Sequence, residues 1–306
     1  MEKRDIQAYA ELYNHAEAHD PEFRRKSAKD VESDIFRKPT DTMDGYFIAL
    51  EDGKMVAGGG GRITSDKGGD GRSHFTFYIL QEFLKSDVEL ALFERIAEYS
   101  KEKGAINLGI RANTSNLSKI KMLDRLGFVE NAYQRHHMER SPHGVPEPAL
   151  PTGYRLRNAR MPDEMGALLE TLNDAFSTRM KFGLFTIDEI SKYTYFYELE
   201  SLPGLFVLER EGDGRIVGLV GSQIEHVYNV EHGRKRGASY SLAVIPSERG
   251  KGFGRALMQS SLRWLDEKGM DVAYLGVNHQ NPDAVHLYSN LGYEVVGIWQ
   301  GFERKL

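Results

Sequence analysis

The chain has 306 residues, 40% of them hydrophobic and 28% charged, with no cysteine and a formal net charge of −5. This length predicts about two globular domains, and the negative charge argues against a general nucleic-acid binder, which needs clustered basic residues. The missing cysteines exclude disulfides, thiolate zinc sites and a cysteine nucleophile, and the lack of a long apolar run or leader pattern leads us to expect a cytoplasmic protein.

The first half of the chain contains a hairpin pattern at residues 46–56, followed by a run of four glycines from Gly58 to Gly61. A displaced phosphate-binding loop is one interpretation of this run. Residues 63–73 show no helix pattern, however, so no helix N-terminus is available there to bind an anion. We therefore expect a strand of small residues packed closely against its neighbours.

Two adjacent histidines, His136 and His137, lie at the end of a strand-like stretch. Adjacent side chains on a strand point to opposite faces, so these two rings are poorly placed to share a metal ion. We expect no metal cofactor.

A proline-rich segment divides the chain. Four of the ten prolines fall within residues 141–152. Such a segment forms neither a helix nor a central strand and favours an extended, stiff spacer. We therefore expect a first domain at residues 1–140, a linker at 141–152 and a second domain at 153–306.

The second half begins with a strand pattern at residues 154–157 and a helix pattern opened by Pro162 and Asp163. Two further strands are expected at residues 205–210 and 215–229, joined by a turn. The segment between the helix and these strands is rich in aromatic residues, which could line an acceptor pocket or belong to the core. These aromatic residues are Phe182, Phe185, Tyr193, Tyr195 and Tyr197.

A basic segment, residues 232–236, precedes the next strand. We expect its side chains to be solvated. Contact with an acidic substrate or with a phosphate is the alternative.

A glycine-rich loop follows the strand that ends in Leu242-Ala243-Val244, and an amphipathic helix comes directly after it. Its glycines, Gly250, Gly252 and Gly254, let the backbone close around a phosphate. The first amides of the helix have no intrahelical partner and carry partial positive charge. The pattern predicts a phosphate-binding loop, with a ligand-free glycine turn as the alternative.

Two common phosphate-binding motifs do not fit this loop. A dinucleotide fingerprint counted from Gly250 needs a glycine at position 255, where the chain has Arg255. A Walker loop occurs nowhere in the sequence.

The helix after the loop has an apolar inner face and ends at Lys268-Gly269, before a strand at residues 272–277. A short helix follows, with Asn281 as its N-cap and Pro282 at its first position. Tyr288 lies on the apolar face of this short helix. Taken alone, this tyrosine could simply belong to the core.

Two motifs in this region resemble those of the GCN5-related N-acetyltransferase (GNAT) superfamily. The spacing Arg249-x-x-Gly252-x-Gly254 is similar to its acetyl-CoA pyrophosphate loop, and the pattern over residues 281–293 is similar to its second acetyl-CoA motif. The resemblance extends over residues 153–306. It implies an α/β fold with a mixed, mostly antiparallel sheet flanked by helices, and acetyl-CoA as co-substrate. The implied cofactor-binding residues are Leu242, Ala243, Val244, Arg249, Gly250, Lys251, Gly252, Phe253, Gly254, Arg255, Asn281 and Tyr288.

The same resemblance implies roles in catalysis. Tyr288 would protonate the departing CoA thiolate, and a backbone amide near Val244 would stabilise the carbonyl oxygen. Many family members have a glutamate that acts as the general base at the position where this chain has Ala238. We expect Glu225 to replace it, with Tyr240 acting through a water as second candidate; a solvent-facing role for Glu225 is the alternative.

The first half resembles a second copy of this fold. An offset of 165 residues, which places Asn116 on Asn281, aligns residues 104–128 with the second half without a gap. Lys85, Asp87 and Glu89 then fall on the three loop glycines, and Leu123 falls on Tyr288. Carboxylates at a pyrophosphate site repel the ligand. We therefore expect a degenerate first domain that has lost the cofactor site.

We expect an N-acetyltransferase that transfers an acetyl group to a primary amine of a small molecule or peptide by direct attack. A transferase with another acyl or aminoacyl donor and a non-catalytic CoA-binding or interaction protein are the alternatives. The acceptor amine, the acyl preference, the role of the first domain and the choice between monomer and homodimer stay open at this level.

Overall fold

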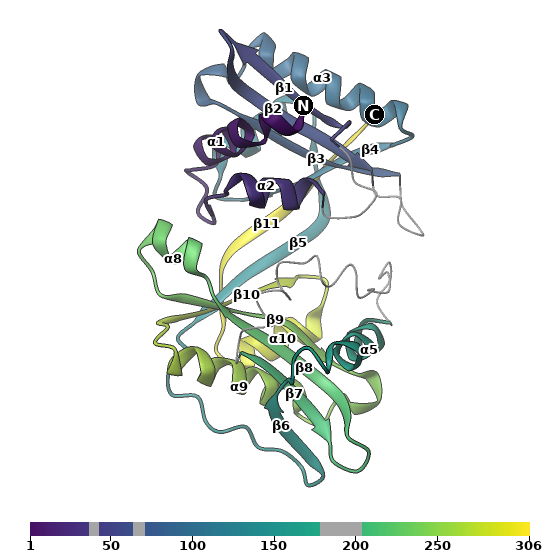
Figure 1. The fold of residues 1–306 in the computed structure, drawn as a ribbon, viewed down its shortest axis with the longest axis vertical. Helices are drawn as coiled ribbons and strands as arrows, with labels where there is room; N and C mark the ends of the chain where they lie inside the picture. Colours follow the sequence, from purple (N-terminus) through teal and green to yellow (C-terminus); the bar gives the residue numbers. More distant parts are fainter. Residues whose placement is uncertain (37–42, 64–70, 178–203) are drawn as a thin grey trace. The chain divides into compact units, whose positions relative to one another are not determined.

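The computed structural model describes residues 1–36, 43–63, 71–177 and 204–306. They form two compact units, the first made of Met1–Arg135 with Gly297–Leu306 and the second of His136–Val296. The hydrogen-bonded strand order is β1-β2-β3-β4-β11-β5-β10-β9-β8-β7-β6. Strands β5 and β11 each run from one unit into the other, so the C-terminal residues complete the first unit (Figure 1).

The first unit has a sheet covered by helices on both faces. Phe75 and Phe77 of β3 pack towards α3, whereas Tyr78 packs with α1 and α2 on the opposite face. This separation follows from the alternation of side chains along a strand. The elements are α1 (Ile6–Ala16), α2 (Ala28–Ile35), β1 (Tyr46–Glu51), β2 (Lys54–Ile63), β3 (Arg72–Ile79), α3 (Asp87–Glu102), β4 (Asn107–Asn113), α4 (Leu117–Arg125) and β5 (Val129–Arg140).

The glycine run at residues 58–61 lies within β2, which confirms the expected strand of small residues. A Cβ atom on Gly59 would overlap the carbonyl oxygen of Thr76, and one on Gly61 would overlap the hydroxyl of Ser100. Glycine is therefore needed here for close packing.

The second unit also has a sheet between helices. Helix α5 packs on one face against Val207, Ile216 and Leu219, while α9 covers the other face against Val217 and Val220. The elements are β6 (Tyr154–Asn158), α5 (Met165–Phe176), β7 (Leu205–Arg210), β8 (Arg215–Ile224), α8 (His226–His232), β9 (Arg236–Val244), α9 (Phe253–Glu267), β10 (Val272–Asn278), α10 (Pro282–Asn290) and β11 (Glu294–Lys305). The α/β fold with a mostly antiparallel sheet is confirmed.

The repeat is present element by element. The offset of 165 residues converts the bounds of β4, α4 and β5 into those of β10, α10 and β11. It also converts the one-turn helix Gln81–Phe83 into Pro246–Glu248, and the last residue of α3 into the last residue of α9. The two halves therefore share one architecture from the motif strand onward.

The expected linker, residues 141–152, contains no helix or strand. Its Val145 is buried in the same core as α9, and its His143 bonds Asp266 at 2.6 Å. The segment thus packs on the second unit. The division of the chain into domains at 140 and 153 stays a prediction.

Two local expectations are wrong. The strand expected at residues 215–229 ends at Ile224, and α8 begins at His226 because Asn229 turns back to bond both the N–H and the carbonyl of Arg236. The basic segment 232–236 is not uniformly solvated either. The side chain of Arg236 is 0% exposed and bonds the carboxylates of Glu225 and Glu139.

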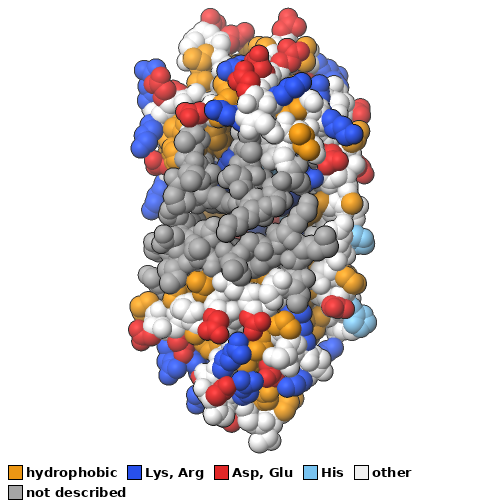
Figure 2. Space-filling model, turned by 90° about the vertical axis from the view of Figure 1, so that its right-hand side faces the viewer, with side chains coloured by type: hydrophobic (Ala, Val, Ile, Leu, Met, Phe, Trp, Pro, Cys, Tyr) orange, Lys and Arg blue, Asp and Glu red, His pale blue; other side chains and the backbone are white. Residues whose placement is uncertain are grey.

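Acidic and basic side chains are interspersed over the described atoms on the face shown in Figure 2. Such mixing is ordinary for a protein with a small net charge. No helix in the described part of the chain is long and apolar enough to cross a membrane.

Candidate functional site

The glycine-rich loop ends as the N-terminus of α9. Gly250 and Gly252 have left-handed φ values of 79° and 83°, and Gly252 is the N-cap of the helix. No side chain caps this helix end, so its first amides are available to an anion. A Cβ atom on either glycine would meet nothing within 4 Å, which leaves open space on the loop. The geometry fits the predicted pyrophosphate loop.

A buried carboxylate holds the loop in shape. Glu248 is 4% exposed and bonds Lys251 at 2.7 Å, Tyr154 at 2.7 Å and Arg210 at 2.8 Å. The hydrogen bond from Lys251 holds the pKa of Glu248 below its usual value, and the same contact raises the pKa of Lys251. Lys251 would therefore share its charge between Glu248 and a bound phosphate.

The two arginines of the motif have different surroundings. Arg249 donates from Nε to the carbonyl oxygen of Val244 at 3.1 Å and from Nη2 to the carbonyl oxygen of Ala175 at 2.5 Å, so it ties the loop to β9 and α5. Arg255 is exposed, and no carboxylate in the described part of the chain pairs with it. Arg255 is therefore the better placed of the two to meet a phosphate.

Strands β9 and β10 pair in parallel over only three residue pairs, ending at Ala238 and Tyr274. Beyond that point β9 continues along β8 and diverges from β10. A β-bulge between Tyr240 and Ala243 adds one residue to β9, and Ser241 has a left-handed φ of 50°. Bulges bend a strand and occur beside active sites. The bulge and the divergence open the sheet where the cofactor arm is expected.

The divergence exposes backbone groups of β9. The N–H of Ile245 donates to Val217 of β8 at 3.0 Å. Because backbone groups alternate along a strand, the N–H of Val244 points to the opposite side, into the gap. This orientation is the one that the predicted oxyanion donor requires.

Helix α10 brings the second motif to the loop. Leu287 lies 3.2 Å from the position that a Cβ atom on Gly254 would take, so α10 packs on the first turn of α9. Tyr288 is half-buried beside Tyr293, with ring centroids 6.0 Å apart. Asn281 is the N-cap of α10, but its side chain makes no capping hydrogen bond. The structure therefore packs α10, which carries Tyr288 and begins after Asn281, beside the first turn of α9.

The expected base does not lie at the loop. Glu225 is 9% exposed, and its Oε2 accepts a hydrogen bond from Arg236 Nε at 2.6 Å. Arg236 is the first residue of β9, whereas the loop follows the last, so roughly 25 Å of strand separates them. Tyr240 lies between these points, packed with α5 on the same face as Ala238.

Some sequence expectations fall outside the described residues. The aromatic segment of the expected acceptor pocket is such a case, because it lies within residues 178–203. Phe182, Phe185 and Tyr193 belong to it. Among the described residues, no three His, Cys, Asp or Glu side chains group as a metal site.

Two functional features were missed at the sequence level. The bulge at Ser241 has no residue signature, and it is visible only in the register of β8 and β9 and in the left-handed φ of Ser241. The loop support from Glu248 was also missed, because its partners Tyr154 and Arg210 are distant in sequence.

The first unit shows what fills the same turn when no cofactor is expected. Glu89, in place of Gly254, is 4% exposed and accepts the backbone N–H of Lys85 at 3.0 Å. Arg125 clamps both oxygens of this carboxylate, at 2.9 and 3.0 Å. Lys85 has a left-handed φ of 65°, like Gly250. The turn before α3 thus binds a carboxylate of its own chain through the N–H of Lys85.

Comparison with known proteins agrees with this geometry. Residues 167–293 match the acetyltransferase (GNAT) family model. A mycothiol acetyltransferase of Thermobispora bispora is 32% identical over 151 residues, which cover 49% of this chain and 49% of that protein. One of Saccharomonospora viridis is 30% identical over 156 residues, with the same coverage of 49% and 49%. The chain thus spans about half the length of the curated relatives it matches.

Solved structures resemble the whole chain. A GCN5-related N-acetyltransferase from Sphaerobacter thermophilus has a TM-score of 0.69 at 17% identity and covers 100% of this chain and 94% of that one. A tandem GNAT protein from the clavulanic acid biosynthesis pathway has a TM-score of 0.69 at 12% identity, with coverage of 99% and 95%. At these identities the likeness concerns the fold alone.

Proposed function

We propose that this chain, whose residues 167–293 match the acetyltransferase (GNAT) family model, transfers an acetyl group from acetyl-CoA to a primary amine of a small molecule or peptide. The observation that carries this proposal is the uncapped N-terminus of α9, with Gly250 and Gly252 in left-handed conformations. Acetyl-CoA would supply the activated acyl group as a thioester. The amides of residues 252–255 and the guanidinium of Arg255 would hold its phosphates.

The acyl group would lie between the diverging strands. The N–H of Val244, which points into the gap, would donate to the carbonyl oxygen as it gains charge. Asn281, whose side chain is not used for capping, would orient the arm that leads to the thioester. Tyr288 would give its proton to the departing sulfur. With no cysteine in the chain, the amine attacks the thioester directly.

The amine must lose protons before and during attack, since an alkyl ammonium has a pKa near ~10.4. Tyr240 is the better placed candidate for this step, because Glu225 lies beyond the other end of β9 from Val244; Glu225 is the alternative. Glu225 would have to accept a proton while bonded to Arg236, whereas Tyr240 would act through a water. Replacing each by its isostere, Glu225→Gln and Tyr240→Phe, separates them: the true base alone shifts the pH profile of kcat/KM.

The acceptor can be identified by measuring CoA thiol release from acetyl-CoA with a panel of amines. The names of the curated relatives put mycothiol-related amines into this panel, beside amino sugars and peptide amines. We expect amine-dependent release by the unaltered chain. Binding of acetyl-CoA without thiol release for any amine would favour a non-catalytic module. Faster thiol release from a longer acyl-CoA than from acetyl-CoA would identify the longer acyl-CoA as the donor.

A further inference from the structure

The first unit contains a cavity of about 580 Å³ that no part of the proposed acetyl transfer uses. It lies on the face of the sheet that carries α1 and α2, where β3 and β4 stop pairing after His74 and Gly109. None of its lining residues belongs to the turn at residues 83–90 that Glu89 fills, which is on the α3 side. The cavity has the size of a site for a small organic molecule.

One part of the cavity wall is aromatic. Four tyrosines touch in an edge-to-face chain: Tyr13 with Tyr78 at 5.1 Å, Tyr9 with Tyr78 at 5.8 Å and Tyr9 with Tyr46 at 6.3 Å between ring centroids. Burial raises the pKa of Tyr9, Tyr13 and Tyr78, so these hydroxyls stay protonated and neutral. Such a wall accepts a ring or another apolar body.

The lining is rich in positive charge. Five Lys and Arg side chains line the cavity, against two carboxylates; they are Lys26, Arg62, Arg72, Arg111 and Lys119, against Glu17 and Asp34. Each carboxylate already has a lysine partner at 2.7 Å, Lys119 for Glu17 and Lys26 for Asp34.

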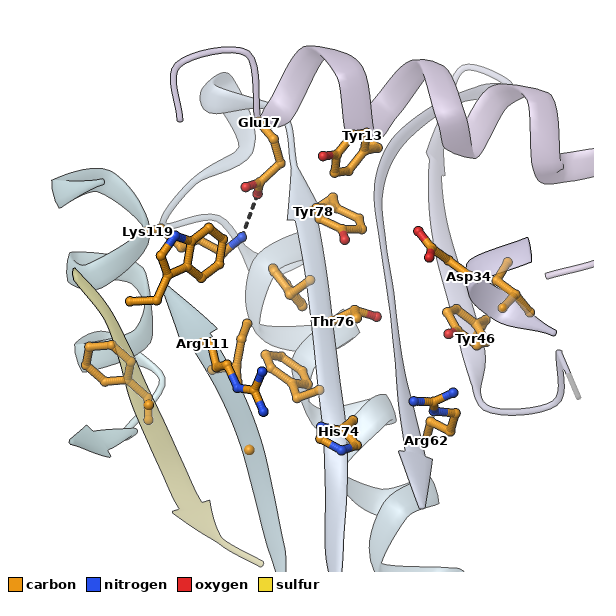
Figure 3. Close-up of a pocket in the computed structure, with 18 of the residues that line it drawn as sticks. Tyr13, Glu17, Asp34, Tyr46, Arg62, His74, Thr76, Tyr78, Arg111 and Lys119 are labelled. Atoms are coloured by element: carbon orange, nitrogen blue, oxygen red, sulfur yellow. Dashed lines mark hydrogen bonds and ion pairs between the residues drawn. The ribbon is translucent and has the colours of Figure 1, made fainter. Parts of the chain in front are cut away.

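Basic side chains gather at one end of the cavity. In Figure 3, Arg62, His74 and Arg111 lie towards one end of the cavity, and Glu17 with Tyr13 lies at the other. The guanidinium of Arg111 is stacked on the ring of Tyr133 at 4.2 Å, and no carboxylate in the described ranges pairs with it. Stacking fixes the plane of this guanidinium while its N–H groups stay available.

We propose that this cavity binds a small organic oxyanion, with its carboxylate or phosphate group at the Arg62, His74 and Arg111 end and its ring or apolar body against the tyrosines. Guanidinium groups bind both kinds of oxyanion through paired N–H donors. The first unit, with its phosphate turn filled by Glu89, is thus a ligand-binding domain for a molecule other than acetyl-CoA.

The test uses the full chain and titration calorimetry with two matched panels, aryl carboxylates and aryl or glycosyl phosphate monoesters. Inorganic phosphate and acetate serve as control ions, because they carry the oxyanion without a ring or other large apolar group. We expect at least one compound from one panel to bind at least tenfold more tightly than these two ions, and the panel that contains it identifies the oxyanion. Saturating CoA should leave this binding unchanged.

The matched variants are Arg111→Gln in the cavity and Arg4→Gln, an exposed arginine of the same unit outside it. Arg111→Gln should weaken binding at least tenfold, and Arg4→Gln should leave it unchanged. If Arg111→Gln lowers the melting temperature of the chain, Arg62→Gln provides the same test. No binding from either panel, equal binding to all variants, or displacement by CoA would each overturn the proposal.

Discussion

The N-terminus of α9 and the N-terminus of α3 occupy corresponding places in the two halves, but their turns differ: α9 begins after Gly252 with a left-handed φ, and α3 begins after Ser86 in an extended conformation. Both contain a left-handed residue at the first loop position, Gly250 with φ 79° and Lys85 with φ 65°. No side chain caps either helix, but before α3 the chain's own Glu89 accepts the backbone N–H of Lys85 and is clamped by Arg125. The comparison teaches that one left-handed loop residue before a helix does not make a cofactor site, because the first half lacks the second left-handed position that Gly252 provides. The site also requires that no side chain of the chain occupies it.

The motif strands differ in the same sense. Strand β3 pairs with β2 without a register shift, while β9 has a bulge at Ser241. Both strands stop pairing with their parallel neighbour after three pairs. The divergence is therefore a property of the fold, and the bulge is confined to the half that carries Tyr288.

The largest expected effect is on catalysis. Tyr288→Phe removes the proton donor but keeps the ring beside Tyr293, so kcat should fall by about 10²- to 10³-fold with little change in KM for acetyl-CoA. Steady-state measurement of CoA thiol release checks this. Tyr293→Phe is the matched control and should retain kcat within a few-fold. Equal losses in both variants would mean that the pair has a structural role only.

The second effect is on cofactor affinity. Gly252→Asp places in the second half the residue that the first half has at Asp87, and should weaken acetyl-CoA binding at least about a hundredfold through repulsion and a strained left-handed φ. Gly252→Ala introduces the backbone strain without the charge, so it should weaken acetyl-CoA binding less than Gly252→Asp does. Asp87→Gly should leave the affinity unchanged. An unaltered affinity for Gly252→Asp would move the site away from this loop.

The third effect is on the stability of the first unit. Glu89→Gln leaves Arg125 without its carboxylate and should cost roughly 2 kcal/mol of unfolding free energy, moderated because Arg125 is partly solvated. Each unit contains one tryptophan, Trp299 in the first and Trp264 in the second. Urea unfolding followed by Trp299 fluorescence in a Trp264→Phe background isolates the first unit.

Glu94→Gln is the matched control for this prediction, because Glu94 is an exposed residue of the same helix. Its unfolding free energy should change by less than about 0.5 kcal/mol. Equal stability of the Glu89→Gln and Glu94→Gln variants would show that the internal carboxylate does not stabilise the turn.

The smallest effect is the pH dependence of the loop before α9. The pKa of Glu248 is lowered by Lys251, so its contribution to stability is complete above about pH 5 and is lost as the pH falls through the lowered pKa. Glu248→Gln should lower the unfolding free energy of the second unit by about 1 kcal/mol at pH 7, measured by Trp264 fluorescence. Plotted against pH, the unfolding free energies of the variant and the unaltered chain should converge in acid. If the difference in unfolding free energy between the variant and the unaltered chain grew as the pH fell, this prediction would be wrong.

Much of the architecture was predictable from local signals. Asn281 with Pro282 marked the start of α10, and Gly269 marked the end of α9, because caps and left-handed termini are encoded within a few residues. The internal repeat predicted the first half. What could not be predicted depends on contacts distant in sequence, such as the burial of Arg236 between Tyr228 and Tyr274, which withdraws it from the basic segment.

The candidate site follows the same rule. The loop and Tyr288 belong to contiguous motifs, so sequence was enough to single them out. The base is not part of a motif, since Ala238 stands in the usual position. Glu225 was chosen by residue type, and its ion pair with Arg236 is visible only in three dimensions.

Titration calorimetry of the full chain with acetyl-CoA tests the central claim most directly, because it counts sites. If only the open turn at α9 holds the cofactor, the stoichiometry is one acetyl-CoA per chain, and Gly252→Asp abolishes the signal. Two sites per chain, or one site that survives Gly252→Asp, would contradict the assignment of the cofactor to the second half alone.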